Sequence, residues 1–178
     1  MDTPQAVNFA GSVRPLRAAD LPSIERILEL WVRDSPSSPP LSAEIEEHLS
    51  RMSSSLSEDR GYKYLVAATA DEEIIGVVGM RPPTSEMLPF ASTERPAEMI
   101  NAYVDTRHRK GRGVGTALVR GLERLALECG YSEMILNSGP RYRHSGWEFF
   151  DKLGYERRDL ARDLYGEGEH APVWSKIL

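Results

Sequence analysis

The stretch Tyr103–Leu118, with the sequence YVDTRHRKGRGVGTAL, decides how this chain is interpreted. An apolar, strand-like run ends at Val104, basic residues follow, and glycines then alternate with other residues up to Gly115, where a strongly helical stretch begins. Glycine allows backbone N–H groups to face a ligand without a side chain in the way. A helix start adds unpaired N–H groups and the positive end of the helix dipole, and Lys110 and Arg112 add cationic donors. The segment is therefore predicted to bind an anion, with phosphate as the first choice.

Two common phosphate-binding templates do not fit this glycine loop. The P-loop has Lys-Ser/Thr directly after its second glycine, whereas Gly115 is followed by Thr116 and Ala117. The dinucleotide fingerprint needs a glycine at position 116 or 118, and these residues are Thr and Leu. Glycines alone are also compatible with a flexible turn that binds nothing, so the rest of the chain has to identify the class of site.

Composition limits the choice of fold and partner. A chain of 178 residues with 40% hydrophobic composition is predicted to form one domain over residues 1–178, with residues 1–11 as a flexible N-terminus. The net charge of −5 argues against a nucleic-acid partner, because there is no basic excess to neutralise a phosphate backbone. A single cysteine, Cys129, excludes an internal disulfide and fits a reducing compartment. Without signal-peptide features or an apolar run of membrane-spanning length, we expect a cytoplasmic protein with no membrane partner.

Hydrophobic periodicity and turn residues predict the order strand, two helices, three strands, helix, strand, helix, two strands. The predicted strands are Ser12–Leu16, Tyr62–Ala68, Glu73–Met80, Glu98–Val104, Glu133–Asn137, Tyr155–Leu160 and Val173–Leu178. The predicted helices are one capped by Asp20 with Ile24, Ile27, Leu28 and Trp31, one capped by Ser42 with Ile45, Leu49 and Met52, then Thr116–Glu128 and Ser145–Leu153. On the third helix, Leu118, Leu122, Leu125 and Cys129 are expected to form a core stripe, with Gly130 as its C-cap. The long polar loop Pro82–Pro96 is expected to serve function.

The run Val104–Gly115, the later segment Trp147–Tyr155 (WEFFDKLGY) and the order of elements together resemble the GCN5-related N-acetyltransferase (GNAT) family. In that family a strand ends in an Arg/Gln-x-x-Gly-x-Gly loop before a helix, and a Phe-Tyr-x-Lys-x-Gly-Phe-like segment lies near the end. The resemblance covers about Val13 to Leu178. It implies an α/β fold with a mixed, mostly antiparallel central sheet of about seven strands, helices on both faces, and the fourth and fifth strands splayed.

The resemblance also implies acetyl-CoA, or another acyl-CoA, as co-substrate; we expect no metal cofactor, because the histidines lack metal-ligand spacing. The N–H groups of Gly111–Thr116 would hold its pyrophosphate, and pantetheine would run alongside the fourth strand. Asn137 would face the pantetheine arm, although a turn role for Asn137 is an equal alternative. The implied coenzyme contacts are Ala102, Tyr103, Val104, Arg109, Lys110, Gly111, Arg112, Gly113, Val114, Gly115, Thr116, Asn137 and Phe150. The implied partner is a small-molecule or peptide amine, and a homodimer is compatible with the sequence.

Two positions depart from the family pattern. Lys110 stands where the family usually has Arg or Gln, and Val104 lies one residue further from the glycines than is common, so either Arg109 or Lys110 takes the usual role. Phe150 stands where many members have a tyrosine that acts as general acid. A phenyl ring cannot donate a proton, but a thiol pKa near ~8.5 makes CoA thiolate a tolerable leaving group without an acid. Tyr142 is a candidate substitute acid or simply a partly buried aromatic residue.

Acyl transfer to an amine needs a base and donors for the developing oxyanion. Glu98 is the predicted base, because it begins an otherwise apolar strand and matches a strand glutamate that several family members use; a solvated strand-end glutamate is the alternative. The backbone N–H of Tyr103 or Val104 could serve the oxyanion, and Asn101 is expected to orient water or substrate. The four histidines are scattered without metal-ligand spacing.

The sequence thus predicts an acyl-CoA-dependent N-acyltransferase that transfers an acetyl group directly to a primary amine. A non-catalytic acyl-CoA-binding or regulatory module on the same fold is the first alternative, because Phe150 lacks a hydroxyl group. A nucleotide-binding protein is the second. The sequence does not identify the acceptor amine.

Overall fold

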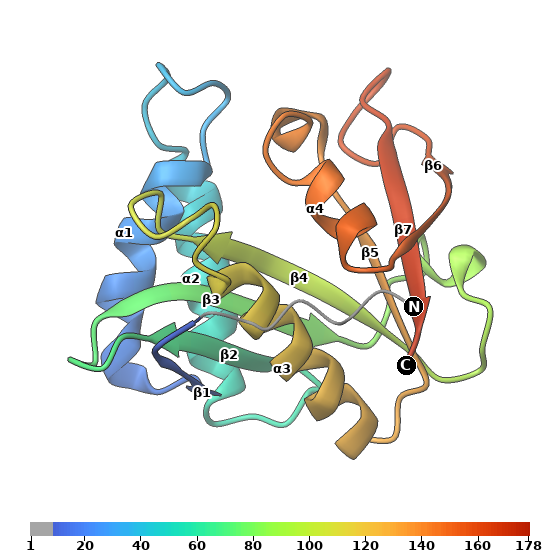
Figure 1. The fold of residues 1–178 in the computed structure, drawn as a ribbon. Helices are drawn as coiled ribbons and strands as arrows, with labels where there is room; N and C mark the ends of the chain where they lie inside the picture. Colours follow the sequence, from blue (N-terminus) through green and yellow to red (C-terminus); the bar gives the residue numbers. More distant parts are fainter. Residues whose placement is uncertain (1–8) are drawn as a thin grey trace. The chain divides into compact units, whose positions relative to one another are not determined.

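The computed structural model describes residues 9–178, so the predicted flexible segment at residues 1–11 lies mostly outside the described residues. The described strands are β1 (Ser12–Pro15), β2 (Lys63–Ala68), β3 (Ile74–Arg81), β4 (Pro96–Val104), β5 (Glu133–Asn137), β6 (Glu156–Ala161) and β7 (Ala171–Ile177). The helices are α1 (Leu21–Trp31), α2 (Ser42–Ser55), α3 (Val114–Glu128) and α4 (Trp147–Lys152), and short 3-10 turns cover Ala18–Asp20, Leu88–Phe90 and Pro140–Tyr142 (Figure 1). The predicted order of strands and helices is confirmed.

The strands form a mixed seven-stranded sheet in the order β1-β2-β3-β4-β5-β7-β6. The pairs β1–β2, β5–β7 and β6–β7 are antiparallel, whereas β4–β5 is parallel. The last strand along the chain, β7, lies between β5 and β6. The predicted mixed sheet is therefore confirmed.

The strands β4 and β5 pair over a short distance. Their parallel ladder joins Pro96–Glu98 to the first three residues of β5, although β4 continues to Val104 and β5 to Asn137. Within residues 9–178 the ladder has no pair beyond Glu98 and Ile135. Backbone groups of β4 beyond Glu98 are thus left outside this ladder, and the predicted splay is confirmed.

The described chain divides into two compact units, each made of two segments. The first unit contains residues 9–79 and 101–122, and the second contains Met80–Ile100 and Glu123–Leu178. Three elements, β3, β4 and α3, run from one unit into the other.

In the first unit, α3 packs across β1, β2 and β3, and α1 and α2 lie on the other face of these strands (Figure 1). Close packing depends on Gly76, where an added Cβ would lie 2.8 Å from Leu118 Cδ1. Gly121 similarly brings α3 near Val13 and Leu65. Strand β3 is buried along nearly its whole length, which explains its almost continuous apolar sequence. The sheet and α3 together fix where β4 ends and the glycine loop begins.

In the second unit, Met87, Ile135, Ala161 and Val173 form a buried cluster beneath the loop between β3 and β4. Glu133, on β5, has a buried carboxylate that accepts hydrogen bonds from two backbone N–H groups of this loop. The donors are Ser92 and Thr93, each at 2.8 Å. The predicted functional loop Pro82–Pro96 is thus attached to the sheet at defined points.

Two local predictions were wrong and a third holds in part. Asp20 stands at the N-cap position of α1, as predicted, but its side chain makes no capping hydrogen bond to the helix; its carboxylate accepts hydrogen bonds from the backbone N–H of Arg17 and from the guanidinium of Arg14. Ser42 is the first residue of α2, not its cap. Cys129 is exposed rather than part of the core, because α3 ends at Glu128 and Ala126 takes the buried position.

Candidate functional site

The turn after β4 is organised by Asp105. Its N–H donates to the Ile75 carbonyl at 2.8 Å, which joins the end of β4 to the start of β3. Its carboxylate accepts the N–H of Arg107 at 2.9 Å, and its carbonyl accepts the N–H of His108 at 2.8 Å. An aspartate that bonds to the backbone two residues on is a common turn-forming device. The chain therefore leaves the sheet in a fixed direction before it reaches the glycines.

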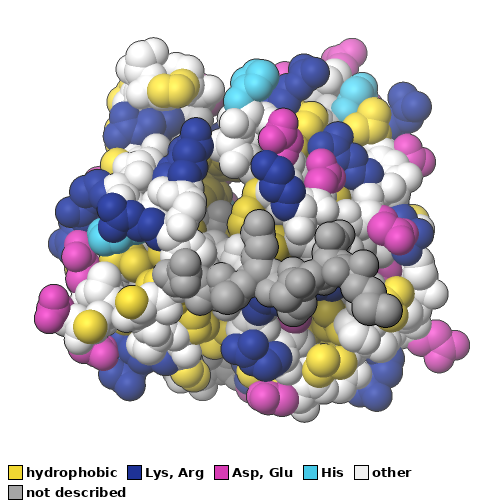
Figure 2. All heavy atoms as spheres, viewed as in Figure 1, with side chains coloured by type: hydrophobic (Ala, Val, Ile, Leu, Met, Phe, Trp, Pro, Cys, Tyr) yellow, Lys and Arg dark blue, Asp and Glu magenta, His cyan; other side chains and the backbone are white. Residues whose placement is uncertain are grey.

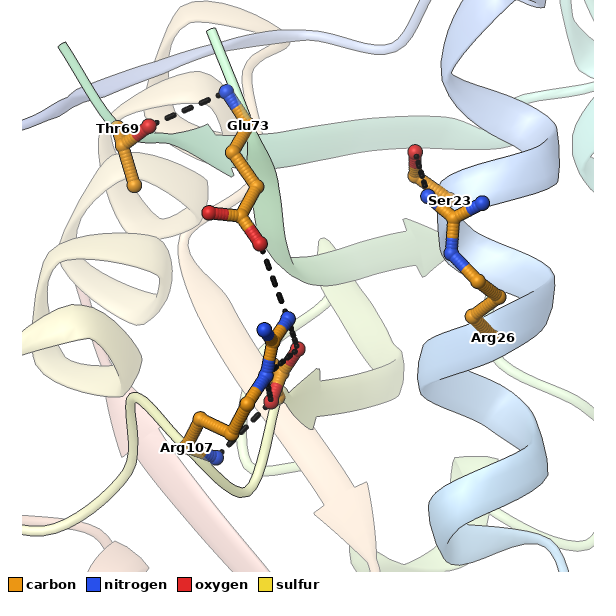
Figure 3. Close-up of polar contacts among 6 residues, drawn as sticks. Ser23, Arg26, Thr69, Glu73 and Arg107 are labelled. Atoms are coloured by element: carbon orange, nitrogen blue, oxygen red, sulfur yellow. Dashed lines mark hydrogen bonds and ion pairs between the residues drawn. The ribbon is translucent and has the colours of Figure 1, made fainter. Parts of the chain in front are cut away.

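Arg107 holds this turn through its side chain. Its guanidinium donates to Asp105 at 2.7 Å and to Glu73 at 2.9 Å, and Figure 3 shows its side chain reaching Glu73, whose N–H bonds to Thr69. The hydrogen bond from Arg107 is the main cause that holds the pKa of Asp105 below its ordinary value. The cations that remain for an anion are Arg109, Lys110 and Arg112.

The glycine loop contains residues with a left-handed backbone. Lys110, Gly111 and Gly113 have φ values of 59°, 75° and 70°, a region that glycine enters without steric cost. Helix α3 begins at Val114, and the Ala117 N–H already bonds to the Gly113 carbonyl at 2.9 Å. The N–H groups from Val114 to Thr116 precede that first bond, as at any helix start. The geometry suits an anion at the N-terminus of a fifteen-residue helix.

Arg109 and Lys110 differ in their surroundings. The Arg109 guanidinium lies 5.0 Å from the centre of the Trp31 ring, within cation–π distance. Lys110 is exposed. Lys and Arg side chains gather over the region of this loop in Figure 2. Arg109 is therefore the better fixed of the two cations.

The end of β4 contains an irregularity that the sequence did not reveal. Asn101 has a φ of 53° within the strand, a conformation that asparagine tolerates better than most residues. Beyond it, the side chain of Trp31 donates from Nε1 to the Val104 carbonyl at 2.8 Å. The Val104 carbonyl oxygen thus has one lone pair engaged by Trp31, while Ala102 and Tyr103 continue the strand.

The predicted base, Glu98, is buried in the second unit, with 1% of its surface exposed. One carboxylate oxygen accepts a hydrogen bond from Arg81 at 2.9 Å, and the other accepts the N–H of Thr84 at 3.0 Å. Glu98 is therefore not a solvated strand-end residue. A carboxylate has about four lone-pair positions, so these two bonds leave it able to accept further hydrogen bonds.

Asn137 lies at the end of β5 and makes side-chain contacts within the second unit. Its Oδ1 accepts a hydrogen bond from the Tyr165 hydroxyl at 2.6 Å, and its Nδ2 lies 3.4 Å from the sulfur of Met87. These contacts fix the orientation of the amide. They connect β5 to the segment between β6 and β7.

Phe150 is buried in an aromatic cluster on α4. Its ring centre lies 5.2 Å from that of Phe149, 6.0 Å from Tyr155 and 5.7 Å from Trp174. Tyr142 lies in the turn before α4, half-buried, with the Arg141 guanidinium over its ring. The Tyr155 hydroxyl donates to Glu123 at 3.1 Å.

Sequence reasoning missed three residues and one backbone feature that bear on the proposed site. Trp31 was assigned only to a core stripe, and Arg81 and Tyr165 drew no attention. The αL backbone of Asn101 was also missed. Asn101 and Trp31 carried weak signals, namely an asparagine inside an apolar strand and an indole N–H that needs an acceptor when buried.

Among the described residues, no group of three or more His, Cys, Asp or Glu side chains could hold a metal ion. In the same part of the chain, none of the helices is long and apolar enough to span a membrane.

Known proteins resemble this chain in sequence and in fold. The sequence profile of the acetyltransferase (GNAT) family matches residues 24–155. Human N-acetyltransferase 8 is 29% identical over 109 residues, which are 61% of this chain and 45% of the human protein. The match thus spans less than half the length of this curated relative.

Two solved structures share the fold. A GNAT-family protein from Desulfovibrio desulfuricans has a TM-score of 0.74 at 17% identity, covering 94% of this chain and 99% of that one. A phosphinothricin acetyltransferase of the GNAT superfamily from Sinorhizobium meliloti, solved with AcCoA, has a TM-score of 0.67 at 24% identity, covering 96% and 89%.

Proposed function

Since the chain belongs to the acetyltransferase (GNAT) family, we propose that it transfers an acetyl group from acetyl-CoA directly to the primary amine of a small molecule or peptide. The observation that carries the proposal is the αL backbone of Lys110, Gly111 and Gly113 directly before α3. The similar enzyme from S. meliloti was solved with AcCoA, which supports the same donor here.

In the proposed complex, the N–H groups of the loop from Gly111 to Thr116 bind the pyrophosphate of the coenzyme. Backbone N–H groups bind phosphate without a counter-charge of their own, and the helix N-terminus adds favourable potential. Arg109 supplies the cation, since Trp31 fixes its guanidinium. The β4 backbone at Ala102–Val104 is the proposed partner of pantetheine, and Asn137 and Phe150 are proposed as further coenzyme contacts.

The proposed reaction is a direct displacement at the thioester. The neutral amine attacks the carbonyl carbon, the C–S bond breaks, and CoA leaves as thiolate. The ammonium proton passes to Glu98, directly or through one water. A backbone N–H at Tyr103 or Val104 is proposed to stabilise the oxyanion. The thiolate needs no acid at a thiol pKa near ~8.5, which is consistent with phenylalanine at position 150.

The proposal is tested by incubating the protein with acetyl-CoA and a panel of amines: 1,4-diaminobutane, glycinamide, glucosamine and a lysine-containing tripeptide. Release of CoA thiol, with acetylated amine detected by mass spectrometry, is the expected result. Binding of acetyl-CoA without turnover of any amine would instead support the non-catalytic acyl-CoA-binding module.

Glu98→Gln tests the proposed base. We expect kcat/KM to fall by roughly 10²–10⁴-fold, the usual worth of positioned proton transfer, while the Kd for acetyl-CoA changes little. Glu94→Gln is the matched control, because Glu94 is an exposed residue close by in the chain. A fully active Glu98→Gln enzyme would assign the base to another residue. Thermal unfolding of each variant checks that the loss of the Arg81 pairing has not unfolded the protein.

A further inference from the structure

The αL residue of β4, Asn101, is joined to helix α2 by a side-chain hydrogen bond. Its Nδ2 lies 3.2 Å from Nδ1 of His48. An amide nitrogen only donates hydrogen bonds, so Nδ1 of His48 is the acceptor and the imidazole proton sits on Nε2. That Nε2 lies 3.7 Å from a carboxylate oxygen of Glu44, one turn earlier on α2. The orientation of the Asn101 amide is therefore set from α2.

The oxygen of the Asn101 amide has no hydrogen-bond partner among the described residues. The Oδ1 atom of Asn101 is buried, and among residues 9–178 it meets no hydrogen-bond donor. Buried polar atoms in native proteins are nearly always hydrogen-bonded, so an exception calls for an explanation such as a catalytic role or a bound partner. The residue also has a φ of 53°, and sparsely populated backbone conformations gather at functional sites.

We propose that Asn101 Oδ1 accepts a hydrogen bond from the N–H of the acceptor amine, and that His48 is the positioning residue that keeps this oxygen toward the amine. The inference rests on the proposed acetyl transfer and specifies where its acceptor is held. An amide oxygen cannot remove a proton at neutral pH, so Asn101 orients the attacking nitrogen and leaves proton removal to the base.

Protonation of His48 reverses this arrangement. An imidazolium carries N–H at both nitrogens, so Nδ1 becomes a donor and repels the Asn101 NH₂ group. The amide then rotates, presents Oδ1 to His48 and turns its NH₂ toward the amine. The charged groups acting on His48 are Glu44, Glu47 and Arg51 on α2, while β4 presents the neutral Asn101 amide. Burial is the main cause that lowers the pKa of His48 below 6.5.

The test compares steady-state kinetics for the best amine of the panel described above with calorimetric binding of acetyl-CoA. Asn101→Gly keeps the positive φ and removes the amide, so we expect KM for the amine to rise by roughly ten- to a hundredfold. The Kd for acetyl-CoA should stay within about twofold, since the β4 backbone is retained.

His48 is tested by two variants and a control. His48→Leu should raise KM by about tenfold, whereas the amide oxygen of His48→Gln can accept from Asn101 and should recover most of the loss. Below neutral pH, wild-type kcat/KM should fall more steeply than that of His48→Gln, because only imidazole changes from acceptor to donor. Glu46→Gln, at an exposed position of α2, should match the wild type.

The outcomes separate the two claims. Wild-type turnover with an unchanged KM in Asn101→Gly contradicts this inference alone. Parallel pH profiles for the wild type and His48→Gln contradict the positioning role of His48. The absence of turnover of every amine by a wild-type protein that binds acetyl-CoA contradicts the proposed function, and the inference with it.

Discussion

At the scale of single residues, two polar side chains of the proposed site each form a hydrogen bond with a side chain from another segment of the chain. Glu98 on β4 meets Arg81 at the end of β3, at 2.9 Å. Asn101, three residues later, meets His48 on α2. Each pair fixes one functional group by a partner that lies far away in the sequence. The chemistry proposed for the site therefore depends on side chains that no local motif contains.

The half-buried imidazole of His48 has a consequence for stability. Its folded pKa is lowered, chiefly by burial, from the ordinary value of 6.5. The unfolded chain therefore takes up a proton at a higher pH than the folded chain does. The contribution of His48 to the free energy of unfolding is therefore fully present above pH 6.5. It falls as the pH drops toward the folded pKa, by at most about 1.4 kcal/mol per pH unit.

We therefore expect the free energy of unfolding of the wild type, minus that of His48→Gln, to decrease between pH 7.5 and pH 5.5. Urea unfolding at several pH values measures this difference. A difference that stays constant across this range would show that His48 has the same pKa in both states.

The side-chain pairings explain why parts of the site could not be predicted. Glu98 was predicted as a strand residue near the chemistry, but its bond to Arg81 requires the β3–β4 arrangement. The turn role of Arg107 likewise depends on Glu73 from a different strand. Basic residues near a glycine loop look alike in sequence, and only their tertiary partners distinguish Arg107 from Arg109.

At the scale of elements, most of the fold follows from local patterns. Apolar alternation and turn residues give the seven strands, with ends within two residues of those observed. The start of β4 was placed too late, because Pro96 normally discourages a strand; it is tolerated as a first strand residue. The start of α3 was also placed too late, since Gly115 is a poor helix former. The helix nevertheless includes Gly115, and one turn later its Leu118 packs against β3 at Gly76.

The glycine loop gives a matched pair of variants. Gly113 and Gly168 have φ values of 70° and 78°, so alanine at either position carries a similar strain of about 1–2 kcal/mol. Only Gly113→Ala places a methyl group where the backbone is proposed to approach phosphate. For Gly113→Ala we expect the Kd for acetyl-CoA to rise by roughly tenfold or more, which corresponds to about 1.4 kcal/mol. The two variants should lose the same amount in melting temperature. Equal affinity in both variants would move the phosphate site away from this loop.

The loop also contains two candidate cations that can be compared directly. Arg109→Ala removes a guanidinium fixed on Trp31, whereas Lys110→Ala removes an exposed ammonium group. We expect the first change to weaken acetyl-CoA binding by about tenfold and the second by less than about threefold, as is usual for an exposed charge. The reverse order would assign the usual arginine role to Lys110.

At the scale of the whole molecule, the chain has the fold of its family, and its acceptor site is a proposal. Family membership follows from the match to residues 24–155, which covers the splayed strands and the glycine loop. The chain has a net charge of −5, but the glycine loop is locally basic. This local positive charge would attract an anionic coenzyme to the loop. The match to the family does not identify the acceptor amine.

The central claim is that the glycine loop makes this chain an acetyl-CoA-binding enzyme, and calorimetric titration of acetyl-CoA tests it most directly. We predict saturable binding at one site per chain, with ATP at the same concentration producing little heat. Such binding should also raise the melting temperature by mass action. A flat titration with acetyl-CoA and with CoA, or ATP binding as tight as that of acetyl-CoA, would contradict the claim.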